Sequence, residues 1–191
     1  FTLSVNALST TILGGDDDDT FVFTTASTLT TSKVDGGSGS DSISVASALT
    51  SGYFLGDAGS DTMVFSSSVS NSTIDLGAAA DSVFFSSSVD ATTVLGGEGA
   101  DTVVFSQAVS RSSIDLGAGS EVFTLSVNAS NTTIAGGEGD DTLVFTTAST
   151  LTTPRVEGGA GNDTISVATA LTNGYFLGDA GSDTMVFSSS V

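Results

Sequence analysis

The chain has 191 residues, and its 22 acidic residues against 3 basic ones give a net charge of −19. This charge argues against nucleic acid as a partner, because phosphates are bound by Lys and Arg, and it suits divalent cations. Histidine and cysteine are absent, which excludes disulfides and the common base–nucleophile pairs of enzymes. No run of about 18 apolar residues predicts membrane insertion. An acidic disordered chain is the alternative, but the apolar residues are too regularly spaced for it.

Two repeats organise the chain. Residues 1–69 recur as 123–191 with 14 substitutions, which defines a long repeat of 122 residues. A short period of 20 residues, twice lengthened to 22 by a Thr-rich stretch, is marked by one carboxylate per coil. We call these residues the anchor column: Asp19, Asp41, Asp61, Asp81, Asp101, Glu121, Asp141, Asp163 and Asp183. We expect residues 1–191 to be a single continuous solenoid, an excerpt of a longer array.

The first element expected in each coil is a short strand directly after the anchor. Apolar residues stand two and four positions later in every coil, from Phe21 and Phe23 to Met185 and Phe187. Alternation with period two predicts a strand with one buried face. One and three positions after the anchor lie Thr, Ser, Val and Phe84, which predict a flat outer wall. We expect a partner to contact this wall at Val22, Val64, Phe84, Val104, Val144 and Val186; a merely solvated face is the alternative.

A second strand is expected seven positions before each anchor, where every coil has Ile, Val or Phe. Its outer positions alternate between Leu and an acid, and Lys33 and Arg155 are placed to pair with Asp35 and Glu157. Each coil therefore has two short strands and two turns, and stacking coils about 4.8 Å apart pairs their backbones. The predicted fold class is an all-β parallel solenoid.

The turn that ends at the anchor is rich in glycine, as in GGSGSD (36–41) and GGAGND (158–163). Gly permits a tight turn whose carbonyls can face a cation, and Asp adds a hard oxygen ligand. One turn supplies too few oxygens for Ca²⁺, so we expect each ion between neighbouring coils. The predicted ligands are the anchor carboxylates and the turn carbonyls of Gly37, Gly39, Gly59, Gly97, Gly99, Gly137, Gly139, Gly159, Gly161 and Gly181.

The motif in GGAGNDTIS (158–166) resembles the haemolysin-type (RTX) nonapeptide repeat, GGxGxDxUx. The resemblance implies a right-handed parallel β-roll, calcium held by turn carbonyls and Asp carboxylates, and secretion in an unfolded state. It covers the glycine-rich half of each coil, so calcium is expected along one edge only. We expect strong sites between Asp41 and Asp61 and among Asp141, Asp163 and Asp183. Weaker or vacant sites are expected at Asp81, in LGAAAD (76–81), and at Glu121, in LGAGSE (116–121).

These features predict a structural extracellular protein of a bacterial surface, which folds with calcium and self-associates laterally or end to end. A surface fibre, an S-layer-like coat and an adhesin stalk fit equally well, and no capping coil is expected at either end. A calcium-dependent module that binds a surface polysaccharide, with Tyr53 and Tyr175 as stacking aromatics, is the alternative. An ice-binding solenoid is a minor alternative. Catalysis is not expected, because the carboxylate pairs repeat equivalently and none stands out.

Overall fold

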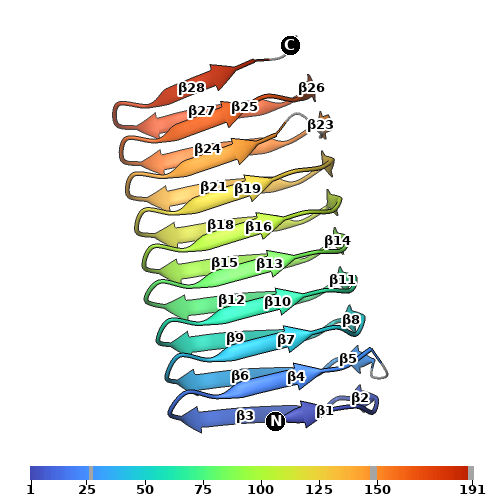
Figure 1. The fold of residues 1–191 in the computed structure, drawn as a ribbon. Coiled ribbons are helices and arrows are strands. Elements are labelled where there is room, and N and C mark those ends of the chain that lie inside the picture. Colours follow the sequence, from blue (N-terminus) through green and yellow to red (C-terminus); the bar gives the residue numbers. More distant parts are fainter. Residues whose placement is uncertain (26–27, 147–149, 189–191) are drawn as a thin grey trace.

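The computed structural model describes residues 1–25, 28–146 and 150–188. Within them the chain rises as a column of stacked coils (Figure 1). The near strands run from left to right and the far strands return as the chain climbs, so the coil is right-handed. The predicted parallel β-solenoid is confirmed. The Thr-rich stretches at 24–31 and 146–153 lie partly outside the described residues. No described segment is a helix of the length and apolarity needed to cross a membrane.

Three parallel sheets run along the column, each made of one strand from every coil. The ten-stranded sheet holds the strands that follow the anchors: β1 (Thr2–Leu3), β4 (Thr20–Phe23), β7 (Ser42–Val45), β10 (Thr62–Phe65), β13 (Ser82–Phe85), β16 (Thr102–Phe105), β19 (Val122–Leu125), β22 (Thr142–Phe145), β25 (Thr164–Val167) and β28 (Thr184–Phe187).

The opposite sheet holds the strands that lead into the glycine-rich turns, and all of them have six residues. They are β3 (Thr11–Asp16), β6 (Lys33–Ser38), β9 (Tyr53–Ala58), β12 (Thr73–Ala78), β15 (Thr93–Glu98), β18 (Ser113–Ala118), β21 (Thr133–Glu138), β24 (Arg155–Ala160) and β27 (Tyr175–Ala180).

A third sheet, the corner sheet, was not foreseen as a sheet from the sequence, which indicated only an apolar residue there. Its strands have two or three residues: β2 (Ala7–Leu8), β5 (Leu29–Thr30), β8 (Leu49–Thr50), β11 (Val69–Ser70), β14 (Val89–Asp90), β17 (Val109–Ser110), β20 (Ala129–Ser130), β23 (Thr150–Thr152) and β26 (Ala170–Thr172). Residues in the left-handed region, such as Asn71 and Asn131, follow these strands and turn the chain into the opposite sheet.

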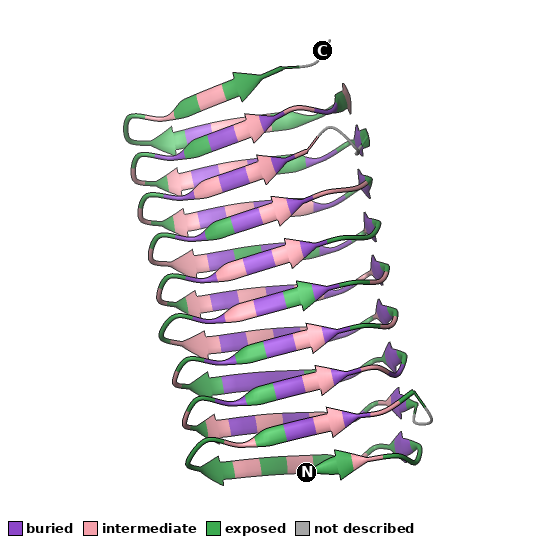
Figure 2. Ribbon diagram, in the orientation of Figure 1, coloured by how far each residue is buried: buried purple, intermediate pink, exposed green. Residues whose placement is uncertain are grey.

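The core is thin and continuous along the column. Side chains two and four positions after each anchor are buried, except in the last described coil, where Met185 is half-buried and Phe187 is exposed (Figure 2). Phe54 from the opposite sheet touches Phe23 and Phe65 of the ten-stranded sheet, with ring centroids 6.0 and 5.5 Å apart. Phe85 and Phe105 stack with centroids 4.6 Å apart. The coils are therefore joined by an aromatic ladder as well as by backbone hydrogen bonds.

Candidate metal centre

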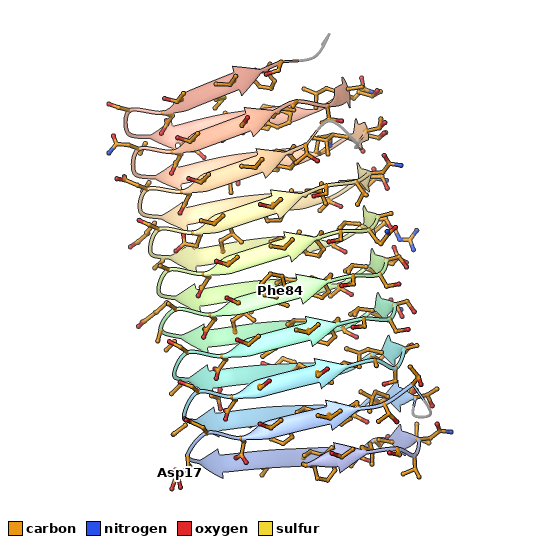
Figure 3. All side chains as sticks on the ribbon, in the orientation of Figure 1. Asp17 and Phe84 are labelled. Carbon is orange, nitrogen blue, oxygen red and sulfur yellow. The ribbon has the colours of Figure 1, made fainter. Side chains whose placement is uncertain are left out.

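The anchor carboxylates lie inside the edge where the glycine-rich turns meet the ten-stranded sheet. Asp41, Asp61, Asp81, Asp101, Glu121, Asp141 and Asp163 are each no more than 2% exposed, whereas Asp19 and Asp183, in the end coils, are half-buried. Asp17, by contrast, lies exposed at the outer tip of the first turn (Figure 3). Buried carboxylates are rare unless they have partners, so the anchor column requires an explanation.

One oxygen of most anchors accepts a hydrogen bond from the preceding coil, and these bonds form a ladder along the column. The backbone N–H of Asp41 donates to Asp61 Oδ1 over 2.7 Å, and that of Asp61 donates to Asp81 Oδ1 over the same distance. The same bond recurs along most of the column. Each of these aspartates therefore reaches back to the preceding coil, whereas Glu121 accepts no such bond.

The other oxygen lacks a hydrogen-bond partner within the described residues. Oδ2 of Asp41, Asp61, Asp81, Asp101, Asp141 and Asp163 is buried and unpartnered, as are both oxygens of Glu121. A buried acceptor without a donor costs on the order of 1–3 kcal/mol, and more when it is charged. A row of such oxygens therefore suits a positively charged ligand.

The pKa values of these carboxyl groups are raised, which shows that burial disfavours their charged form. Burial raises the pKa of Asp61 and Asp101 to about 6 and that of Asp81 to about 7. Burial, together with the neighbouring Asp141, raises the pKa of Glu121 to about 9. Burial also raises the pKa of Asp41 and Asp163. A cation beside the unpartnered oxygens would favour the ionised form and reverse these shifts.

Backbone carbonyls from two coils converge on the same edge. The glycine at the fourth position of the motif, such as Gly59 or Gly161, has positive φ. A Cβ on Gly59 would collide with the carbonyl of Gly39 in the coil before, and a Cβ on Gly161 with that of Gly139. The predicted carbonyls of Gly97, Gly99, Gly137 and others likewise face the next coil. Among the other predicted ligands, Gly37 and Gly159 lie four residues before their anchors and Gly181 lies two before its anchor, and all three have positive φ.

A further position, five residues before the anchor, closes the cradle and was not singled out from the sequence. A Cβ on Gly56 would collide with Asp61 Oδ2 and with the carbonyl of Leu76 in the following coil. Gly36, Gly136 and Gly158 are placed in the same way. In the coils that end at Asp81 and Glu121 this position is Leu76 or Leu116, and both side chains are fully buried. The contrast between Gly and Leu was the available signal.

This donor set suits a cation held mainly by backbone. No group of three or more acidic side chains converges in the described part of the chain, so carboxylates alone would not ligate a metal. Each gap between coils instead offers unpartnered carboxylate oxygens together with turn carbonyls from above and below. Ca²⁺ takes six to eight such oxygens in flexible geometry, whereas a softer metal would need His or Cys. The residues present therefore fit Ca²⁺.

Comparison with known families agrees with this chemistry. The pattern of the RTX calcium-binding nonapeptide repeat matches residues 124–144 and 155–167. The chain contains RTX-type calcium-binding repeats. These matches cover part of the second long repeat, and the anchors Asp141 and Asp163 belong to the turns around them. Calcium is the cation that such repeats bind, which agrees with the carbonyl and carboxylate donors of the edge. No curated protein sequence matches the chain.

Among solved structures, the fold is similar to the crystal structure of a hyperactive, Ca²⁺-dependent, β-helical antifreeze protein from an Antarctic bacterium. The TM-score is 0.79 at 18% sequence identity, over 96% of this chain and 56% of that protein. The chain therefore spans little more than half of the protein that it matches. At this identity the similarity concerns the fold.

Proposed function

We propose that the protein is an extracellular structural solenoid, part of a surface fibre, an S-layer-like coat or an adhesin stalk, whose coils are held together by Ca²⁺. The observation that carries the proposal is the row of buried, unpartnered anchor oxygens facing turn carbonyls of the neighbouring coil. A bridging ion neutralises carboxylates that otherwise repel one another at one strand spacing. Calcium thereby supplies cohesion along the column.

The same energetics support an extracellular location. Extracellular calcium modules often bind at about 10⁻⁴ to 10⁻³ M, well above cytosolic calcium levels. In the cytosol the anchor column would keep its repulsion, and the fold would be disfavoured until export. The proposed role is mechanical, because the ions would join each coil to its neighbours.

The proposed ions are unevenly distributed along the edge. The turns ending at Asp41, Asp61, Asp141 and Asp163 combine Gly at the closing position with a buried anchor, which supports strong sites there. Leu76 and Leu116 stand at the equivalent position in the coils of Asp81 and Glu121 and are fully buried, which supports weaker or vacant sites there.

Circular dichroism and calorimetry on the whole chain test the proposal. In EGTA at pH 7.5 we expect little β structure, and addition of CaCl₂ should restore it with saturable heat release. MgCl₂ at equal concentration is the matched control, because Mg²⁺ demands a smaller octahedral site and sheds water reluctantly. Unchanged β content from EGTA to 5 mM CaCl₂, with no binding heat, would contradict calcium-driven folding.

Ice binding is a second candidate, favoured by one observation. Position one after the anchor carries Thr or Ser in eight of nine coils (Thr20, Ser42, Thr62, Ser82, Thr102, Thr142, Thr164 and Thr184), and these residues are in register across the ten-stranded sheet. The interruption is Val122, and Phe84 protrudes beside the column. Thermal hysteresis of the calcium-loaded protein distinguishes this role from the structural one.

A further inference from the structure

The outer face of the ten-stranded sheet is uncharged along its whole length. The chain has 25 charged residues, 22 acidic and 3 basic, and none of them lies in any of the ten strands. The opposite sheet, in contrast, exposes Lys33, Asp35, Arg155 and Glu157. The chain has a net charge of −19, so another acidic surface is repelled least where it approaches this uncharged face.

The face is built of two columns in strict register. One column is mainly Thr and Ser. The other, the Val column, has Val at five of its ten positions: Val22, Val64, Val104, Val144 and Val186. Phe84 stands in the Val column on β13, the fifth of the ten strands, and is 38% exposed. Figure 3 shows it near the middle of the face. An exposed aromatic at the centre of an uncharged surface is the arrangement of an interface anchor.

We propose that a second copy of this chain packs face to face on this sheet. Ten strands about 4.8 Å apart make the face roughly 48 Å long, and two columns with their side chains make it roughly 12 Å wide. Contact would bury on the order of 600 Å² per copy, near 1,200 Å² in total, which is the lower end for specific interfaces. A pair of identical faces is self-complementary about a two-fold axis, with Thr and Val columns interdigitating as in stacked sheets.

Charge selects this occupant over the others that a flat sheet could meet. An anionic polymer or a basic protein would be recognised through charges, and the face has none. Two copies repel each other at every acidic edge and approach with least repulsion through this face. The inference rests on the proposed function, because the face exists only when the calcium-loaded solenoid is folded.

Sedimentation of the whole chain in 2 mM CaCl₂ tests the pairing, with circular dichroism as an independent check of folding. The mass of the wild-type protein should rise from 18.8 kDa toward twice that value as concentration increases, more readily in 0.5 M NaCl, which screens repulsion. The double variant Phe84→Glu/Val104→Glu should remain folded and dimerise at least ~100-fold more weakly, since charges would be buried unpaired.

The matched control is Thr73→Glu/Thr93→Glu, which adds the same charge on adjacent coils of the opposite sheet. It should dimerise nearly as the wild type does. If the first variant fails to fold, Phe84→Ala removes only the protruding ring and supplies the comparison. A folded wild-type protein that stays monomeric to 1 mM would overturn the pairing but leave calcium-driven folding intact. Equal weakening in both double variants, or a monomer that inhibits ice growth through this face, would also overturn it.

Discussion

Asp61→Asn should change the stability of the protein in opposite directions with and without calcium. In the metal-free protein Asn keeps an oxygen that can accept from the backbone N–H of Asp41, and it removes a carboxylate whose second oxygen is buried without a partner. With calcium, the same change removes a charged ligand between two of the turns proposed to bind most strongly. Opposite changes in stability with and without calcium would therefore distinguish a metal ligand from a purely structural carboxylate.

The magnitude follows from the raised pKa. Burial takes the pKa of Asp61 from 3.8 to about 6, and two units correspond to about 3 kcal/mol. Below pH 3.8 the group is protonated in both the folded and unfolded states, so no penalty exists. As pH rises toward 6 the unfolded chain ionises first, and the metal-free fold loses stability. At pH 7.5 in EGTA the variant should therefore be more stable than the wild type by up to about 3 kcal/mol, and at pH 3.5 the two should be equal.

Urea unfolding followed by circular dichroism measures the difference, in EGTA and in 5 mM CaCl₂, with a pH series that begins where the metal-free chain is folded. In CaCl₂ the variant should unfold at lower urea than the wild type and bind fewer ions. Asp81→Asn is the control, since its pKa of about 7 predicts a comparable metal-free gain but Leu76 predicts little calcium-dependent loss. Destabilisation of Asp61→Asn relative to the wild type in EGTA, at a pH above about 4 where the metal-free wild type still folds, would refute the reasoning.

Four further outcomes are expected. The apparent calcium affinity of the wild type should rise between pH 5 and 8, because protons compete for Asp61, Asp81 and Asp101; calorimetry at each pH would reveal a flat profile if they do not. Glu121→Asp should restore a hydrogen bond from the Asp101 backbone and raise calcium-loaded stability by about 1 kcal/mol, seen as a higher urea midpoint. Phe85→Ala should cost about 3–5 kcal/mol, whereas Phe84→Ala should cost under about 1 kcal/mol in the monomer, a contrast that equal losses would contradict. Gly139→Ala should prevent tight stacking, because φ is 119° and a Cβ would collide with the Gly119 carbonyl; an unchanged melting temperature would exclude this.

Much of the fold was predictable because the coil repeats. Alternation two and four positions after each anchor indicated which side chains fill the core, and the observed register pairs equivalent residues of successive coils, as Met63 with Val83. Lys33 bonds Asp35 over 2.7 Å, and Arg155 pairs with Glu157, as the spacing predicted. The corner sheet was missed because two residues are too short to show a period; neighbouring coils create these strands.

The sequence predicted which residues form the site, but not how their carboxylates and carbonyls are oriented. The motif placed the anchors on one edge, but it does not state that their aspartate carboxylates reach back to the preceding coil. That direction comes from the backbone of the turn, whose positive-φ residues aim carbonyls toward the next coil. The role of the position five before the anchor was hidden because Gly and Leu there both belong to the inward face. Only the fold shows that Leu76 and Leu116 are fully buried at the position where Gly56 adjoins the anchor oxygen of its own coil.

In this arrangement calcium binding and folding are coupled through contacts between adjacent coils. Under the proposal each ion touches two coils, so its binding free energy appears as an interface term between neighbours, as in other solenoids. Leu76 and Leu116 interrupt the row while the aromatic ladder continues through Phe65, Phe85, Phe105 and Phe123. The middle coils would then depend on apolar packing and the flanking coils on calcium. Withdrawal of calcium should therefore open the column first beside Asp41 and Asp163, and hydrogen exchange should find the slowest amides between β10 and β19.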